Sequence, residues 1–547
     1  MEAFAMFYCQ FPARCARPEL HLGLSMWGSV VLIKVRKKCQ ALDILGVVDV
    51  KMGQEMIPAA FPFQLESLPK NPPRQRNPLV RAHNKSTAMN RISRRRFLRR
   101  SLAGVAGMGI MTMISDSIQA AEKKASPQHL RVEKIERTTV KVPYRDVPAR
   151  NMARELPHWQ YTEIVEVHLK SGHVGFGETL LYYTWNETSD EAVERAQGKN
   201  AAELMWDDDL GAGLQMALFD AVAKAAEVPV HALLGRKVHD KTPLSWWNID
   251  TSVEDMALEC AEAYKQGYMS YKTKGRPWYD VWAQVEEASK VVPKDFKIDM
   301  DFNDTLLDAE RALPILEDLA QYPQVDIFES PIFQDDVAGN KILMAATDVN
   351  IAMHYGTPDP LIAIRENICD GFVIGHGARE LMASGAVAAM ADKPFWLQLV
   401  GTGITAAFSL HFGAVLSHAT WPAVNCHQLY KYNLLTEPIV VKEGFAQVPD
   451  KPGLGYELNR DMLEKLRVEK PESRPEPPRL IETTWKDGRK MYFGNTGEVN
   501  FVLNPARDGN VPYFERGVDT RLVPNDGSKE WKELYQKSNT KPLLIKG

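Results

Sequence analysis

The feature that most constrains this chain is a run of short apolar segments alternating with helical stretches between Pro243 and about residue 440. The apolar segments are typical of buried strands, and stretches such as 254–266 and 306–320 have the apolar spacing of amphipathic helices. Eight such units in about 190 residues predict a (β/α)8 barrel with its chemistry at the carboxyl ends of the strands. The strands are expected to begin near Leu244, Tyr271, Lys297, Val325, Asn350, Gly371, Pro394 and Ala423.

A doubly wound Rossmann fold is the alternative for alternating strands and helices. Its dinucleotide-binding form carries a GxGxxG sequence directly after a strand. No such sequence follows a predicted strand here, and Gly401-Thr402-Gly403 alone is a weak match. The barrel is therefore favoured.

The segments that flank the barrel have other patterns. Alternating strands from Leu130 to Leu169, a hairpin through residues 171–173 and helical spacing over 187–226 predict a mixed α+β domain. Residues 484–492 predict a further hairpin around Asp487-Gly488. The expected fold class is α/β, a modified TIM barrel with an N-terminal α+β capping domain and a small C-terminal extension. The expected divisions are a capping domain at 128–242, the barrel at 243–440, a segment returning to the cap at 441–468, and a linker with the extension at 469–547.

Charge is distributed unevenly along the 547 residues. Residues 1–121 contain 18 Lys and Arg against 7 Asp and Glu, whereas the rest of the chain contains 48 against 63. An acidic main body has no field to hold a phosphate backbone. Nucleic acid is therefore excluded as an expected partner.

Residues 89–121 have the layout of a signal peptide, in which a basic region precedes a short apolar run and small residues. Ser93-Arg94-Arg95-Arg96-Phe97-Leu98-Arg99 resembles the bacterial twin-arginine export signal. The resemblance implies export to the periplasm, with no stable membrane insertion after cleavage. Met89 is then expected to be the true start, and residues 1–88 a disordered, non-native extension.

Two lysines on the second barrel strand are the first candidate catalytic groups. Lys272 and Lys274 are two residues apart, so their side chains point to the same side of the strand. Mutual repulsion and burial are expected to lower the pKa of both amines, as a lysine that accepts a proton near neutral pH requires.

Acidic side chains occupy the next two strands. Asp299, Asp301 and Asn303 share one side of the third strand, and Glu329 ends the fourth. Carboxylates at successive strand ends converge, and a hard divalent cation such as Mg²⁺ relieves their repulsion. The sequence therefore predicts a metal site beside the lysines.

These residues resemble the enolase superfamily, and within it the mandelate racemase and muconate lactonizing enzyme family, over about residues 130–466. The similarity also includes Met216-Ala217-Leu218-Phe219-Asp220-Ala221 and Pro229-Val230-His231-Ala232-Leu233-Leu234-Gly235. It implies a cap that closes over the barrel, Mg²⁺ on Asp301 and Glu329, and proton removal by Lys272 or Lys274 next to a substrate carboxylate.

The chain departs from the family pattern on later strands. His354 or Tyr355 stands where the family has its third acidic ligand, and His354 as a ligand would shift the preference toward Mn²⁺, Fe²⁺ or Zn²⁺. On the sixth strand His376 is the remaining titratable candidate for catalysis, with a structural role as the alternative. On the seventh, Gln398 replaces a catalytic histidine. Expected substrate contacts are Asn303, Trp247, Asn248 and Gln398, together with Arg145, Arg150 and Arg154 of the cap.

A racemase that uses two bases needs one on each face of the α-carbon. Here only the face next to the lysines has an identified base. The sequence therefore predicts a metal-dependent isomerase, cycloisomerase or lyase acting on a small-molecule carboxylate. An acid-sugar dehydratase and a non-catalytic periplasmic binding protein are the alternatives. A homo-oligomer is expected from the resemblance.

Overall fold

The computed structural model describes residues 21–27, 30–36, 44–49, 128–183, 187–495 and 497–546, in two compact units that divide at residue 102. In the first unit, β1 (His21–Trp27), β2 (Val30–Arg36) and β3 (Ile44–Asp49) form an antiparallel sheet. The predicted signal peptide at 89–121 lies outside the described residues. No helix among the described residues combines the length and apolar character needed to cross a membrane.

Eight parallel strands of the second unit form a closed barrel, which confirms the predicted fold class. Each strand pairs with the next in chain order from β7 to β13, β14 pairs with β7, and a bridge between Gln398 and Val424 joins the ends of β13 and β14. The strands are β7 (Lys241–Trp247), β8 (Ser270–Lys274), β9 (Lys297–Asp301), β10 (Val325–Glu329), β11 (Asn350–His354), β12 (Gly371–Ile374), β13 (Phe395–Leu397) and β14 (Ala423–Val424).

A helix follows each of the first seven barrel strands. Short polar side chains cap the first five helices by accepting a hydrogen bond from a backbone N–H of the first turn, which fixes where each begins. The cap residues are Ser252, Asp280, Asp308, Asp336 and Asp359. The helices are α7 (Val253–Lys265), α8 (Val281–Val291), α9 (Ala309–Leu319), α10 (Val337–Ala346), α11 (Pro360–Glu366), α12 (Ala378–Met390) and α13 (Gly403–Val415).

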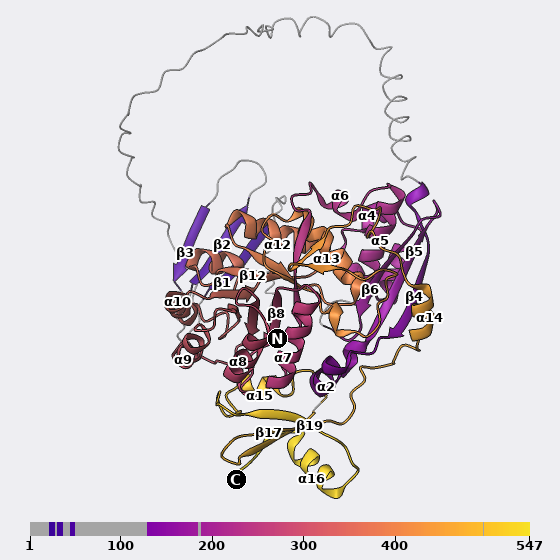
Figure 1. Ribbon diagram of the computed structural model, residues 1–547. Helices are drawn as coiled ribbons and strands as arrows, with labels where there is room; N and C mark the ends of the chain where they lie inside the picture. Colours follow the sequence, from indigo (N-terminus) through magenta and orange to yellow (C-terminus); the bar gives the residue numbers. More distant parts are fainter. Residues whose placement is uncertain are drawn as a thin grey trace, which may run out of the picture. The chain divides into compact units, whose positions relative to one another are not determined.

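The capping region pairs a three-stranded antiparallel sheet, β4 (Val132–Lys141), β5 (Tyr161–Leu169) and β6 (Val174–Leu180), with helix α5 (Ala212–Ala225) (Figure 1). Gly175 and Gly177 allow this helix to lie close to β6, because a Cβ on Gly175 would stand 2.2 Å from the Ala217 carbonyl oxygen. The helical spacing over 187–226 corresponds to several short helices, which include α3 (Asp190–Ala196) and α4 (Ala201–Leu204), as well as α5.

The chain leaves the barrel through β15 (Val441–Lys442) and β16 (Phe445–Gln447), which pairs with β7, and reaches the cap strand β4 with α14 (Arg460–Leu466). The C-terminal extension then forms an antiparallel sheet in the order β19-β17-β18-β20, with α16 beside β18 (Figure 1). The predicted hairpin around Asp487-Gly488 is confirmed. These elements are β17 (Leu480–Thr484), β18 (Lys490–Gly494), α15 (Leu503–Arg507), β19 (Asp519–Val523), α16 (Lys529–Ser538) and β20 (Leu543–Ile545).

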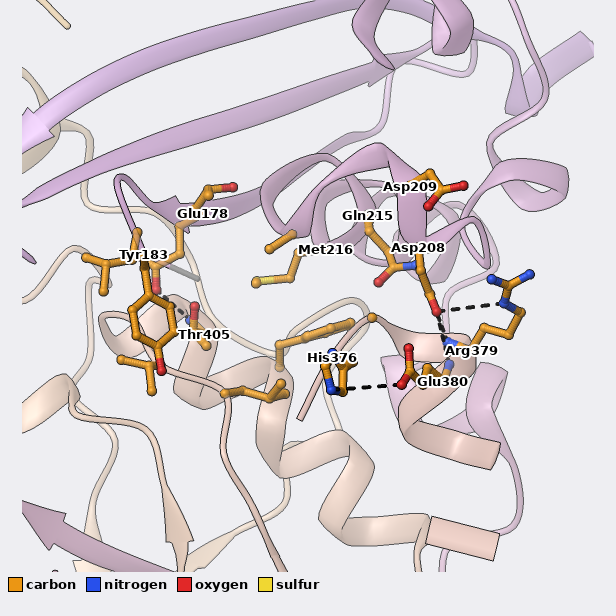
Figure 2. A pocket seen from close by; sticks show the side chains of 17 residues that line it. Glu178, Tyr183, Asp208, Asp209, Gln215, Met216, His376, Arg379, Glu380 and Thr405 are labelled. Carbon is orange, nitrogen blue, oxygen red and sulfur yellow. Dashed lines mark hydrogen bonds and ion pairs between the residues drawn. The ribbon is translucent and has the colours of Figure 1, made fainter. Parts of the chain in front are cut away.

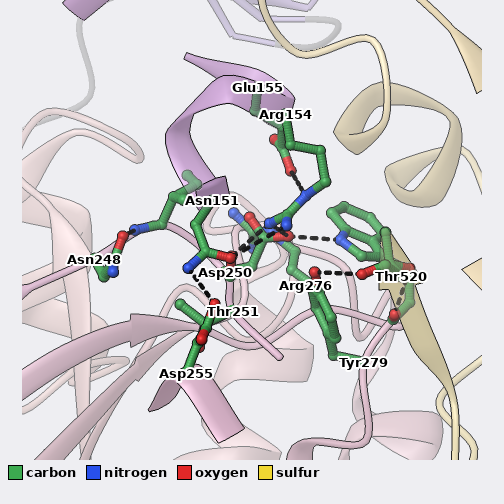
Figure 3. Close-up of polar contacts among 12 residues, drawn as sticks. Asn151, Arg154, Glu155, Asn248, Asp250, Thr251, Asp255, Arg276, Tyr279 and Thr520 are labelled. Carbon is green, nitrogen blue, oxygen red and sulfur yellow. Dashed lines mark hydrogen bonds and ion pairs between the residues drawn. The ribbon is translucent and has the colours of Figure 1, made fainter. Parts of the chain in front are cut away.

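Helix α2 (Asp146–Glu155) joins the cap to the barrel through arginines. Arg150 pairs with Asp255. Arg154 donates to the Asp250 carboxylate at 2.9 Å, as Figure 3 shows. Arg145, just before the helix, pairs with Glu259 at 2.7 Å. The expectation that these arginines contact substrate is therefore not supported, because their charges are used to hold α2 against barrel carboxylates.

Replacing Arg154 with Met should strongly destabilise the protein. Arg154 and Asp250 are both buried, so the change leaves a buried carboxylate without its cation, at a cost of about 3–5 kcal/mol in the free energy of unfolding. Arg195→Ala, which breaks a half-exposed pair with Asp207, should cost less than about 1 kcal/mol. Urea denaturation measures both changes, and equal small losses would contradict the structural role of Arg154.

Candidate active site

A cavity of about 340 Å³ lies at the carboxyl ends of the barrel strands and is lined by residues of the barrel, the cap and the C-terminal extension. The structure brings most of the predicted site residues to this one cavity. Those that line it are Lys272, Lys274, Asn303, His354, Trp247 and Gln398.

The floor of the cavity contains two lysine–carboxylate pairs. The register of β8, β9 and β10 places Lys274 beside Asp301, and Asp301 beside Glu329. Lys274 Nζ pairs with Asp301, and Lys272 Nζ pairs with Glu329 and lies 4.0 Å from Asp301. The side chains of Lys272, Asp301 and Glu329 are at most 1% exposed, so these charges compensate one another out of contact with water.

The two lysines differ in the direction of their pKa shifts. Burial disfavours the charge on both. The Glu329 and Asp301 carboxylates outweigh burial at Lys272 and raise its pKa, which corrects the prediction that this pKa is lowered. At Lys274 burial, together with repulsion from Lys272 and Arg276, outweighs Asp301 and lowers the pKa. Lys274 is thus the better proton acceptor.

Arg276 is a site residue that the sequence reasoning missed. Its guanidinium is buried, lines the cavity, and donates to the carbonyls of Asp301 and Phe302 and to Asn303 Oδ1 at 3.1, 3.0 and 2.6 Å. Asn303 also accepts a hydrogen bond from Lys274 at 3.2 Å. The signal was present in the sequence, because Arg276 continues the two-residue spacing of Lys272 and Lys274.

The predicted metal ligands converge only in part. His354 Nε2 lies 2.9 Å from Glu329 Oε1, whereas Asp301 is paired with Lys274. Tyr355, the other candidate ligand, packs its ring edge-on against Phe372. Within the described part of the chain, no three His, Cys, Asp or Glu side chains form a group that could hold a metal ion. A metal ion bound to Asp301, Glu329 and His354 would have to displace the lysine ammonium groups that pair with both carboxylates.

Three predicted residues lie away from this cavity. His376 lines a neighbouring pocket between cap and barrel, with Glu178, Asp208 and Gln215 (Figure 2), and its Nε2 is 3.9 Å from Glu380. Asn248 is fully buried and does not line the cavity. Asp299 is buried beneath the floor, where burial and the nearby Asp326 raise its pKa to about 8. The structure therefore gives His376 no position beside the lysines.

Glu155, at the end of helix α2, is a second residue that the sequence reasoning missed. Its side chain lines the cavity and is 6% exposed. Burial and the Asp250 carboxylate raise the pKa of Glu155 to about 8, despite the opposing charge of Arg154. The protonated form of Glu155 is therefore favoured relative to a carboxyl group in water, and it contacts the Asp250 carboxylate. No strand-end pattern identifies it, because it comes from the cap.

Several known proteins are similar in sequence to this chain. The family model described as Enolase C-terminal domain-like matches residues 255–462. The N-succinyl-L-Arg/Lys racemase of Bacillus cereus is 23% identical over 338 residues, which cover 56% of this chain and 90% of the racemase. The arabinonate dehydratase of Saccharolobus solfataricus is 25% identical over 343 residues, covering 55% and 89%.

A solved structure of muconate cycloisomerase from Pseudomonas fluorescens aligns with 62% of this chain and 99% of its own length, at 23% identity and a TM-score of 0.51. This likeness supports the fold. Racemases, cycloisomerases, epimerases and an acid-sugar dehydratase occur among the proteins similar to this chain. Together with the family model, they support the enolase superfamily as the group of enzymes to which this chain is related.

Proposed function

We propose that this protein is an isomerase, cycloisomerase or lyase that removes the proton next to a substrate carboxylate. The observation that carries the proposal is the pair of lysines on β8 at the floor of a cavity. In the proposed step the α C–H bond breaks, the proton moves to Lys274 Nζ, and the electron pair enters the carboxylate to form an enediolate.

The charges of the floor favour an anionic substrate. Lys272 and Arg276 line the cavity as cations beside Lys274, whereas the carboxylates of Asp301 and Glu329, which pair with the lysines, do not line it. Lys272 keeps its proton, because neighbouring carboxylates raise its pKa against the effect of burial. Its fixed ammonium can therefore stabilise the negative charge that develops on the enediolate.

Two other residues of the lining, Gln398 and Cys426, offer no second base for the α-carbon. Gln398, which accepts a hydrogen bond from Lys272 at 3.0 Å, has no titratable proton. Burial raises the pKa of the Cys426 thiol, so this side chain is a poor base. A site with its base on one side is suited to cycloisomerisation or to loss of a β-substituent more than to racemisation by two bases.

Glu155 is the proposed acid of the reaction. Loss of a β-substituent breaks a bond to carbon, and the departing oxygen leaves more easily when a proton is delivered to it. Glu155 lines the cavity, and burial with the nearby Asp250 carboxylate raises its pKa, which favours the protonated form. It takes the place for which His376 was considered from the sequence.

Two further functions are proposed as second candidates. Acid-sugar dehydration uses the same lysine and the same acid, and the similarity to arabinonate dehydratase favours it. A non-catalytic binding protein would retain the cationic floor but no turnover. Export to the periplasm, the homo-oligomeric state and the absence of a nucleic-acid partner also remain proposals.

Lys274→Ala should lower exchange of the substrate α-proton by about 10²-fold or more, because the base is removed. The measurement is nuclear magnetic resonance of hydrogen–deuterium exchange in D₂O, over a panel of acid sugars and cycloisomerase substrates. Lys297→Ala, at the opposite end of the barrel strands, should leave exchange unchanged. Full exchange by Lys274→Ala would contradict the assignment, and no exchange by the native protein would favour a binding function.

Glu155→Gln should separate the two steps of the reaction. Glutamine keeps the shape of the side chain but has no proton to transfer, so α-proton exchange should persist while product formation falls by about 10²-fold. Glu464→Gln, an exposed glutamate on α14, is the matched control. An equal loss of both rates in Glu155→Gln would show that Glu155 acts by positioning α2.

The predicted Mg²⁺ site on Asp301, Glu329 and His354 also remains a proposal. His354→Asp should raise the affinity for Mg²⁺ by about tenfold or more, because it replaces an imidazole with the oxygen ligand that Mg²⁺ prefers. Isothermal titration with MgCl₂ measures the change. The native protein could instead bind Mg²⁺ tightly, with no gain in affinity in His354→Asp. That result would show that the lysine–carboxylate pairs of the native protein open to admit a cation.

A further inference from the structure

The C-terminal extension reaches the candidate active site. The matched family model ends at residue 462, so this part of the chain lies beyond the match. Val499, Asn500 and Leu503 of the extension nevertheless line the same cavity as Lys272 and Lys274. Val499 is half-buried, Asn500 is exposed and Leu503 is buried.

We infer that the extension forms a wall of the substrate pocket and selects substrates by the size and polarity of the group distant from the carboxylate. The inference rests on the proposed function, since it takes the lysine floor as the site that holds the carboxylate. It goes further by assigning specificity to Val499, Asn500 and Leu503.

Polar contacts fix the extension to the rest of the site. Arg479, just before β17, donates to the backbone carbonyls of Arg154 and Glu155 at 2.9 and 3.0 Å. Arg507, on α15, pairs with Asp304 next to the site residue Asn303. Two anchors therefore hold the extension to both the cap and the barrel at the edge of the cavity.

Buried contacts on the barrel side add to these anchors. Trp278 and Tyr279, in the loop after β8, belong to the hydrophobic core of the extension together with Ile481 and Val502. Thr520 on β19 donates to the Trp278 carbonyl at 2.8 Å and accepts from Tyr279 Oη at 3.1 Å through its own carbonyl (Figure 3). Because the barrel and the extension share a core, the wall has a fixed position and can discriminate by shape.

The chemistry of the wall indicates the substrate class. Val499 and Leu503 extend an apolar part of the lining that includes Leu156, Trp159 and Ile249, and Asn500 is the polar side chain that the extension adds. A carboxylate held by the cationic floor directs the rest of its molecule against this lining. Hydroxyl groups buried there would lose their hydrogen bonds to water, which is unfavourable. The substrate is therefore a carboxylate that carries an apolar or aromatic group, in preference to a polyhydroxylated sugar acid.

The test measures binding, so that it does not depend on turnover. Isothermal titration of the full chain with phenylacetate, 3-phenylpropionate and 4-phenylbutyrate gives the dependence of affinity on length, and gluconate serves as the polar probe. Val499→Trp should weaken the longest acid about tenfold more than the shortest, and Val499→Ala should not impose this penalty. Leu534→Ala, on α16 outside the cavity, should leave all affinities unchanged.

Each outcome distinguishes the inference from the proposed function. A loss of affinity in Val499→Trp that increases with the length of the acid, with the phenyl acids bound more tightly than gluconate, supports the extension as a wall of the pocket. This holds even if Lys274→Ala does not change α-proton exchange. Equal changes for all acids in both Val499 variants would overturn the wall. Preference for gluconate would overturn the substrate class, and binding of no acid by the native protein would overturn both.

Discussion

Two lysine–carboxylate pairs on three adjacent strands are the constraint on which the site depends. Lys272 and Lys274 on β8 face Asp301 on β9 and Glu329 on β10, and the strand register brings them together. A buried charge is tolerated only where an opposite charge or hydrogen bonds compensate it. Each of these side chains therefore fixes the position of the others, and the floor of the cavity is organised before any substrate arrives.

The cap and the C-terminal extension add residues to the cavity that this floor closes. The cap supplies Glu155, whose pKa is raised by burial and by Asp250, and the arginines of α2 hold that helix against the barrel. The C-terminal extension holds the same helix end through Arg479 and adds Val499 to the cavity. The proposed acid, base and specificity wall thus come from three different regions of the chain.

The sequence alone predicts the barrel and its strand starts well, because alternation of buried strands and helices depends on local patterns. It also places Lys272, Lys274, Asp301 and Glu329 together, since strand ends of a barrel converge. It does not distinguish the two lysines, because their pKa values depend on which carboxylate each one contacts. His376 follows its strand as expected, but its side chain lines a neighbouring pocket, which strand order does not reveal.

A double-mutant cycle on Lys272 and Glu329 tests the central claim most directly. Lys272→Met and Glu329→Gln should each lower the free energy of unfolding by about 3–5 kcal/mol, because each removes the ion-pair partner of a buried charge. The double variant should lose less than the sum of the two by at least about 1 kcal/mol, as measured by urea denaturation. Strictly additive losses would contradict the account, because they would mean that the two charges do not stabilise each other.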